Sequence, residues 1–167
     1  MVRFYMTYKE QYNRVMRYYN RIKTRTNDTQ KEYEDDLYAF FQNCWHLKDW
    51  LKNDPNITVP DQTIEDYANN TFHLKICADL GNRTKHLKLT RKRFDADFNG
   101  NSVKAHLPIG VAYASNPPPA GSEDLTGWIE YEYYINVDNN SKLKALDVAE
   151  KAIGEWDAFF VTHNINV

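Results

Sequence analysis

The sequence predicts an α+β fold that is mainly a helical bundle, with an antiparallel β meander inserted before the last helix. Apolar residues recur every three or four positions up to Leu87, alternate with polar residues after it, and return to helical spacing near the C-terminus. A chain of 167 residues can bury one core of ordinary size. We therefore expect one domain over residues 1–167, with a helical part at 1–87, a β segment at 88–138 and a closing helix at 140–163.

The first two predicted helices each carry a continuous apolar stripe. The first helix spans residues 3–26, and its stripe consists of Tyr5, Tyr8, Tyr12, Val15, Tyr19 and Ile22. The second helix spans residues 30–53, and its stripe consists of Leu37, Phe40, Phe41, Cys44, Leu47 and Leu51. Pro55 ends the second helix, because proline lacks the amide hydrogen that a helix interior needs.

The third predicted helix begins at Asp61, whose side chain can cap a helix N-terminus, and extends to about His86. Its apolar stripe consists of Ile64, Ala68, Phe72, Ile76 and Leu80. Gly81 lies inside this pattern, and a glycine costs a helix about 1 kcal/mol relative to alanine. We therefore expect the helix to bend at Gly81, or a second short helix to begin there.

The β segment is predicted from alternating apolar and polar residues. Asn99-Gly100 is the pair that favours a two-residue hairpin turn, so we expect strands at 88–97 and 102–107 on either side of it. Residues 109–114 are a third short candidate, followed by a proline-containing loop. The strongest strand is 128–137, with one apolar face made by Ile129, Tyr131, Tyr133, Ile135 and Val137.

The closing helix is expected to begin with Ser141 as its N-cap. Its stripe consists of Leu146, Ala149, Ile153, Trp156 and Phe160, which have the spacing of a bundle helix. A full apolar stripe must be buried, so we expect this helix to complete the bundle.

The composition excludes several classes of protein. The chain is 42% hydrophobic and 14% aromatic, which is far from the signature of disorder. No apolar run is long enough to span a bilayer or to form a secretory signal, so we expect a cytoplasmic protein without a membrane segment. Cys44 and Cys77 both lie on apolar stripes, and we expect reduced core thiols. Charge is uneven: residues 1–25 and 83–93 are basic, whereas 121–167 is acidic.

Two stripes of polar residues lie on the second and third helices. The first consists of Gln42, His46, Asp49 and Asn53, and the second of Lys75, Asp79, Asn82 and His86, with Arg83 beside it. Such spacing is also that of an ordinary solvated face. Trp45 and Trp50 flank His46 and Asp49, and a polar pocket walled by indole rings would explain why they are there. If the two helices are antiparallel, Gln42 and His46 approach the level of Asp79 to His86 more closely than Asp49 does.

Three chemistries could use these residues. A metal site built from His46, Asp49, Asp79 and His86 has loose spacing, and we expect neither a metal ion nor another cofactor. Nucleophilic catalysis lacks a serine near either histidine. The third chemistry is metal-independent cleavage of RNA, in which His86 moves the proton of a ribose 2′-hydroxyl and Arg83 stabilises charge on the phosphate. Lys85 and the basic run at 87–94 would hold the RNA backbone.

A helical bundle of this size with an arginine and a histidine near the end of its third helix resembles the HEPN superfamily. That resemblance covers residues 30–88 and implies a metal-independent endoribonuclease of toxin or antiviral systems, acting as a homodimer. In that family four to six residues separate the arginine from the histidine, whereas two separate Arg83 from His86. The pair of segments "WHLKDW" and "DLGNRTKH" also resembles a group of bacterial and phage proteins to which no activity is attached.

The resemblance assigns catalysis to His86 and Arg83. The residues expected to orient them or bind substrate are Asn82, Lys85, Asp79, His46, Asp49, Trp45 and Trp50. A non-catalytic module is the alternative: the tyrosine-rich first helix and the 128–137 strand would bury a partner protein or a second copy of the chain, or the tryptophan-walled pocket would sense a small ligand.

Overall fold

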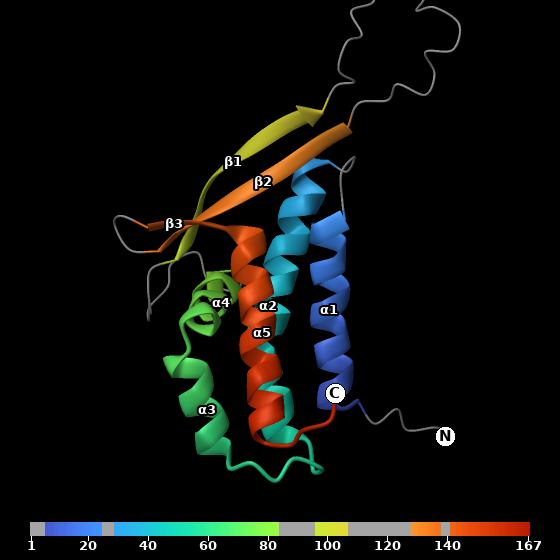
Figure 1. Ribbon diagram of the computed structural model, residues 1–167, viewed down its shortest axis with the longest axis vertical. Helices are drawn as coiled ribbons and strands as arrows, with labels where there is room; N and C mark the ends of the chain where they lie inside the picture. Colours follow the sequence, from blue (N-terminus) through green and yellow to red (C-terminus); the bar gives the residue numbers. More distant parts are fainter. Residues whose placement is uncertain (1–5, 25–28, 84–95, 107–127, 138–140) are drawn as a thin grey trace, which may run out of the picture.

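The computed structural model describes residues 6–24, 29–83, 96–106, 128–137 and 141–167 of the chain. It confirms the predicted fold class, a mainly helical protein with antiparallel strands before the last helix (Figure 1). In chain order the elements are α1 (Tyr8–Thr24), α2 (Gln30–Asn53), α3 (Asp61–Asn70), α4 (Phe72–Arg83), β1 (Asp97–His106), β2 (Trp128–Val137), β3 (Ser141–Lys144) and α5 (Ala145–Thr162).

Helix α2 is the central element, because it contacts each of the other four helices. It begins with a capping box: the Thr29 side chain accepts a hydrogen bond from the Glu32 amide, and the Glu32 carboxylate accepts one from the Thr29 amide. It ends at Asn53, before Pro55, as the sequence predicts. The apolar side of α2 is therefore enclosed by α1, α4 and α5.

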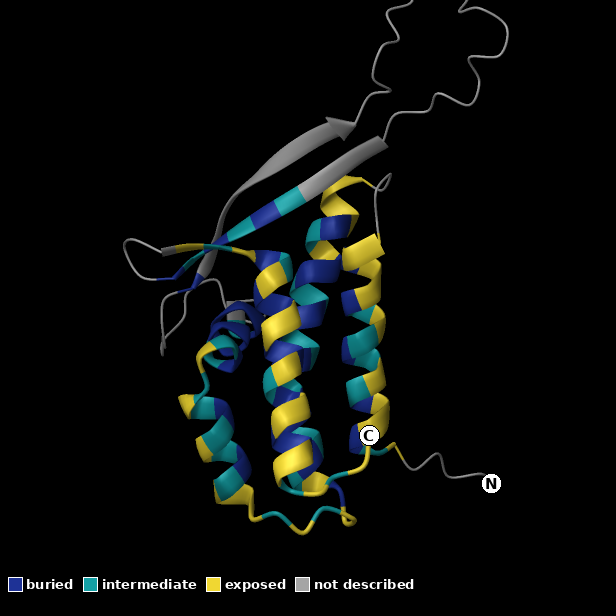
Figure 2. Cartoon of the chain, viewed as in Figure 1, coloured by how far each residue is buried: buried dark blue, intermediate teal, exposed yellow. Residues whose placement is uncertain are grey.

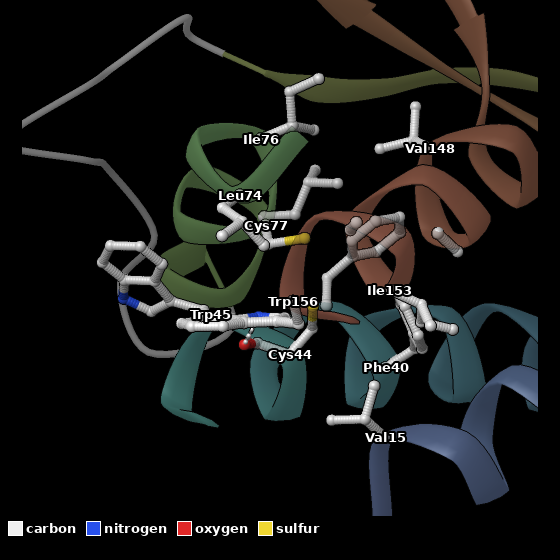
Figure 3. Packing of buried hydrophobic residues seen from close by; sticks show 14 of the residues in the cluster. Val15, Phe40, Cys44, Trp45, Leu74, Ile76, Cys77, Val148, Ile153 and Trp156 are labelled. Atoms are coloured by element: carbon white, nitrogen blue, oxygen red, sulfur yellow. Dashed lines mark hydrogen bonds between the residues drawn. The ribbon is translucent and has the colours of Figure 1, made fainter. Parts of the chain in front are cut away.

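The core lies between these helices, with exposed residues on the outward sides of α1 and α5 (Figure 2). Trp156 of α5 is fully buried and donates its indole N–H to the carbonyl oxygen of Cys44 at 3.2 Å. Figure 3 shows Trp156 and Cys44 together at the centre of the core, with Phe40 and Ile153 beside them. The predicted stripes of the second and closing helices are thus core residues, except that Leu146 is partly buried against the core, and the expectation that α5 completes the bundle is confirmed.

The prediction of the third helix is wrong in one respect. This segment forms two helices that meet at Thr71, and not one helix interrupted at Gly81. The side chains of Asn69, Asn70 and Thr71 bond back to carbonyl oxygens four residues earlier. Such bonds compete with the helical pattern. The carboxylate of Glu155 on α5 then accepts the amides of His73 and Leu74, which begin α4.

The predicted hairpin turn at Asn99-Gly100 is also wrong. Strand β1 continues through this pair and is antiparallel to β2 along its length, with Asp97 opposite Asn136 and His106 opposite Trp128. The register shifts between Phe98 and Asn101, where β1 has one more residue than β2. This is a β-bulge, which also favours asparagine and glycine. Residues 88–95 of the strand predicted at 88–97 lie outside the described residues. The whole candidate strand at 109–114 also lies outside them.

Strand β2 forms the middle of a three-stranded sheet of order β1-β2-β3. Tyr133, Ile135 and Val137 are buried on one face, as predicted from their alternation. Ser141 does not cap the closing helix, because it begins β3 and pairs with Val137, and α5 begins at Ala145. The Tyr133 ring stacks on the Tyr33 ring, with 5.6 Å between the ring centroids. This contact packs the sheet against the start of α2.

The remaining differences are at the ends of helices. Helix α1 begins at Tyr8, later than the predicted residue 3, and residues 1–5 lie outside the described part of the chain. Helix α4 is described as far as Arg83, and the predicted end near His86 lies outside the described residues. Among the described residues, none of the helices is both long enough and apolar enough to cross a membrane.

Candidate functional site

The polar stripe of α2 lies on a face that the packing of the bundle leaves open. Gln42, His46 and Asp49 are partly exposed and Asn53 is exposed, whereas the neighbouring Leu47 and Leu51 are buried. Helix α2 contacts α1, α3 and α4. The stripe remains partly accessible to solvent.

Helix α4 meets this stripe at Gly81. A β-carbon at Gly81 would lie 3.0 Å from the Cα of Gln42 and 3.4 Å from the carbonyl oxygen of Phe41, so only glycine lets the two helices approach this closely. The contact explains why glycine occurs inside a helix that continues past it. It also places the last described turn of α4 at the level of Gln42, which lies one helical turn from His46. Asn82 in this turn of α4 is half-buried.

Asp79 is fully buried one turn before the end of α4. Its carboxylate oxygen Oδ2 accepts the backbone amide of Ala96 at 3.3 Å. Ala96, the first described residue after 84–95, is therefore held by a residue one helical turn before Arg83. Asp79 thus binds the backbone that follows residues 84–95, a role that the sequence does not reveal.

The expected catalytic residues are only partly within the described chain. Arg83 is the last residue of α4, and its side chain lies outside the description. Lys85 and His86 fall outside the described residues, as does the basic run at 87–94. His86 follows Arg83 by three residues, so their Cα atoms are at most about 11 Å apart.

Asp49 belongs to a different group of charges, which joins α2 to α3. Lys48 contacts Asp49 at 2.9 Å and Glu65 at 2.8 Å, and Lys52 pairs with both carboxylates. Burial alone would raise the pKa of Glu65, but the hydrogen bonds and charges of the two lysines outweigh it and lower this pKa to about 2. Asp49 therefore neutralises lysines beside α3, away from Gly81 and the end of α4.

The two tryptophans lie on opposite flanks of the stripe. Trp45 is buried, and the Lys48 ammonium lies 4.9 Å from its ring centroid. Trp50 faces α1, where the Arg14 guanidinium lies 5.5 Å from its ring centroid. Trp50 also lines a cleft of about 310 Å³, here called the Trp50 cleft, together with Met6, Asp49, Asn53 and Asp54. The rings therefore do not face each other across one pocket.

Two residues of α1, the buried Gln11 and the half-buried Arg14, lie beside this face of α2 and are not among the predicted site residues. Gln11 is buried, and its amide nitrogen donates to the carbonyl oxygen of Asn43 at 2.9 Å and to its side-chain oxygen at 3.1 Å. Its own oxygen accepts a hydrogen bond from Arg14 at 2.8 Å. The signal was available in the sequence, because Gln11 lies three residues after Tyr8 and four before Val15, at an apolar position of the stripe.

Within the part of the chain that the structure describes, no group of three or more histidine, cysteine, aspartate or glutamate side chains could hold a metal ion. Cys44 and Cys77 are free and fully buried, in agreement with the expected core thiols. Burial raises the pKa of the Cys77 thiol, and its contact with Cys44 raises it further. The Cys77 thiol is therefore poorly suited to act as a nucleophile.

Comparison of the chain with protein-family models, with curated proteins and with solved structures found no match.

Proposed function

We propose that this protein binds RNA and cleaves it without a metal ion, at a site centred on the C-terminal end of α4. The proposal rests on the contact between Gly81 and Gln42, since it brings the helical turn before Arg83 to the level of the His46 stripe. The hydrogen bond from the Ala96 amide to the Asp79 carboxylate supports the proposal further. This bond holds Ala96, which follows the basic segment in the sequence, at the same helical turn of α4.

The chemistry assigned to the site needs one imidazole and one guanidinium. In the first step the ribose 2′-oxygen attacks the adjacent phosphorus while its proton passes to the His86 imidazole. The bond from phosphorus to the 5′-oxygen then breaks as that oxygen takes up a proton. The products are a cyclic phosphate and a free 5′-hydroxyl. Arg83 stabilises the negative charge that develops on the phosphate oxygens, and Asn82, Lys85 and His46 orient the reacting groups.

Two sites are expected to act together, because the HEPN resemblance implies pairing across a homodimer. Size-exclusion chromatography with light scattering measures this directly. The resemblance predicts a particle of twice the chain mass, and a strict monomer at every concentration would contradict the HEPN interpretation.

The decisive experiment measures cleavage of fluorescently labelled RNA in the presence of a metal chelator. We expect wild-type protein to cut, and His86→Ala to lose at least about 100-fold in rate, because general acid–base catalysis contributes that much or more. His163→Ala is the matched control, since this histidine packs on Phe159 at the end of α5 and is expected to leave the rate unchanged.

Thermal melting shows whether each variant is folded. If wild-type protein cuts neither single-stranded nor hairpin RNA, or if His86→Ala cuts like wild type, the catalytic proposal is wrong. Binding without cleavage would retain the RNA-binding part of the proposal and remove its catalytic part.

A further inference from the structure

We infer that the face of α1 that carries Arg14 and Arg17 contains a phosphate-binding site centred on Arg14, which holds the backbone of the RNA. This inference rests on the proposed function and adds to it a second place of contact, on a helix outside the catalytic segment. The site is a cleft of about 380 Å³, here called the α1 cleft, lined by Met6, Glu10, Asn13, Arg14 and Arg17.

The guanidinium of Arg14 is held in place before any ligand arrives. It lies over the Trp50 ring and donates a hydrogen bond to Gln11, which is itself bonded twice to Asn43 of α2. Gln11 is only 1% exposed, so this support is part of the core and not a surface contact. Holding an arginine in this way lowers the entropy lost when it binds a ligand.

Arg14 and Arg17 also differ from Arg21 of the same helix in their ion pairs. Within the described ranges of the chain, neither arginine forms an ion pair, although Glu10 lines the same cleft. Arg21, one turn further along α1, is paired with Asp36 at 3.0 Å. The guanidinium of Arg14 uses one donor on Gln11, and the other donors suit the oxygens of a phosphate.

The position of the α1 cleft connects it with the proposed catalytic site. Arg14 stacks on Trp50, and Trp50 lies one helical turn from His46 on the exposed side of α2. An RNA strand bound near the end of α4 can therefore continue across the His46 stripe to the α1 cleft. The amide side chain of Asn13 adds a neutral hydrogen-bonding group beside the two arginines.

The test measures binding of a labelled single-stranded RNA whose 2′-hydroxyls are all methylated, so that it cannot be cleaved by 2′-oxygen attack. Binding is followed by fluorescence anisotropy over a range of salt concentrations. Arg14→Gln and Arg17→Gln remove the charges and keep side-chain length. Arg21→Gln is the matched control, because this arginine lies on the same helix but is already neutralised by Asp36.

We expect the double variant with both Arg14→Gln and Arg17→Gln to raise the Kd at least about tenfold at 0.1 M salt. The slope of log Kd against log salt should fall by about 1.4, since each phosphate contact on a single strand contributes about 0.7. Arg21→Gln should alter both quantities little. Arg17→Gln alone keeps the Gln11 and Trp50 contacts of Arg14, so it tests the site even if Arg14→Gln impairs folding.

The inference is overturned if the double variant binds like Arg21→Gln, or if wild-type protein does not bind the methylated RNA. The proposed catalytic function fails separately, if the arginine variants weaken binding as expected and wild-type protein still leaves ordinary RNA intact. Conversely, cleavage of ordinary RNA by wild type together with unchanged binding by the double variant would retain the function and remove the α1 cleft from it.

Discussion

At the scale of single residues, Gly81 shows how packing can explain a residue that its own helix disfavours. Glycine destabilises the interior of a helix, and the sequence analysis accordingly expected a bend or a new helix there. Helix α4 instead continues through Gly81, because the absence of a β-carbon permits contact with the backbone of Gln42. A contact partner distant in sequence cannot be read from spacing along one helix, so this role was not predictable.

Replacement of Gly81 by valine tests this contact. We expect Gly81→Val to lower the free energy of unfolding by about 1–3 kcal/mol, since an overpacked side chain must displace the backbone of Gln42. Gly154→Val is the matched control, because a β-carbon at Gly154 meets nothing within 4 Å and both changes have the same helix propensity. Urea unfolding measures both variants. Equal free energies of unfolding would show that the Gly81 contact has no energetic importance.

At the scale of elements, local sequence signals predicted helices well and strand connections less well. The extent of α2 follows from its own apolar stripe and from Pro55, and the prediction of 30–53 is confirmed. Asn99-Gly100 favours both a tight turn and a bulge, and only pairing with the distant strand β2 distinguishes them. Likewise, Ser141 could cap a helix or begin a strand, and its pairing with Val137 decides for the strand.

The link between α2 and α3 predicts a pH dependence of stability. The folded pKa of Glu65 is about 2, below its ordinary value of 4.5, so its ionised form stabilises the fold. This contribution is fully present above about pH 4.5 and is lost as the pH falls towards 2. We expect Glu65→Gln to lower the free energy of unfolding by about 1–3 kcal/mol at pH 7, because hydrogen bonds to charged groups are lost.

The difference between wild type and Glu65→Gln should shrink between pH 4.5 and pH 2, as measured by urea unfolding at a series of pH values. Asp66→Asn is the control on the same helix, since the exposed Asp66 side chain contacts only Gln62 among the described side chains. A difference that stays constant down to pH 2 would show that the carboxylate of Glu65 is not held by Lys48 and Lys52.

At the scale of the whole molecule, α5 joins parts of the chain that are far apart in sequence. It contacts α1, α2, α4, β2 and β3, and its Glu155 supports the start of α4. The proposed catalytic site therefore depends on α5 indirectly, through the helix that carries Asp79 and Arg83. The sequence predicted a closing helix from its apolar stripe. It could not predict Glu155 as a cap of α4, because a polar residue beside an apolar stripe carries no local sign of a distant partner.

A substitution of Trp156 is the best test of whether α5 holds the helices and the sheet together. It is fully buried, donates to the Cys44 carbonyl oxygen and packs against Tyr67 and Phe160. We expect Trp156→Ala to lower the free energy of unfolding by about 3–5 kcal/mol, as is usual for a buried aromatic side chain. Val161→Ala on the exposed side of the same helix should change it by less than about 0.5 kcal/mol.

Because α5 contacts both the helices and the sheet, unfolding of wild type followed by circular dichroism and by tyrosine fluorescence should give one coincident transition. Separate transitions, or a Trp156→Ala variant as stable as Val161→Ala, would mean that the bundle and the sheet do not depend on α5 as a common support.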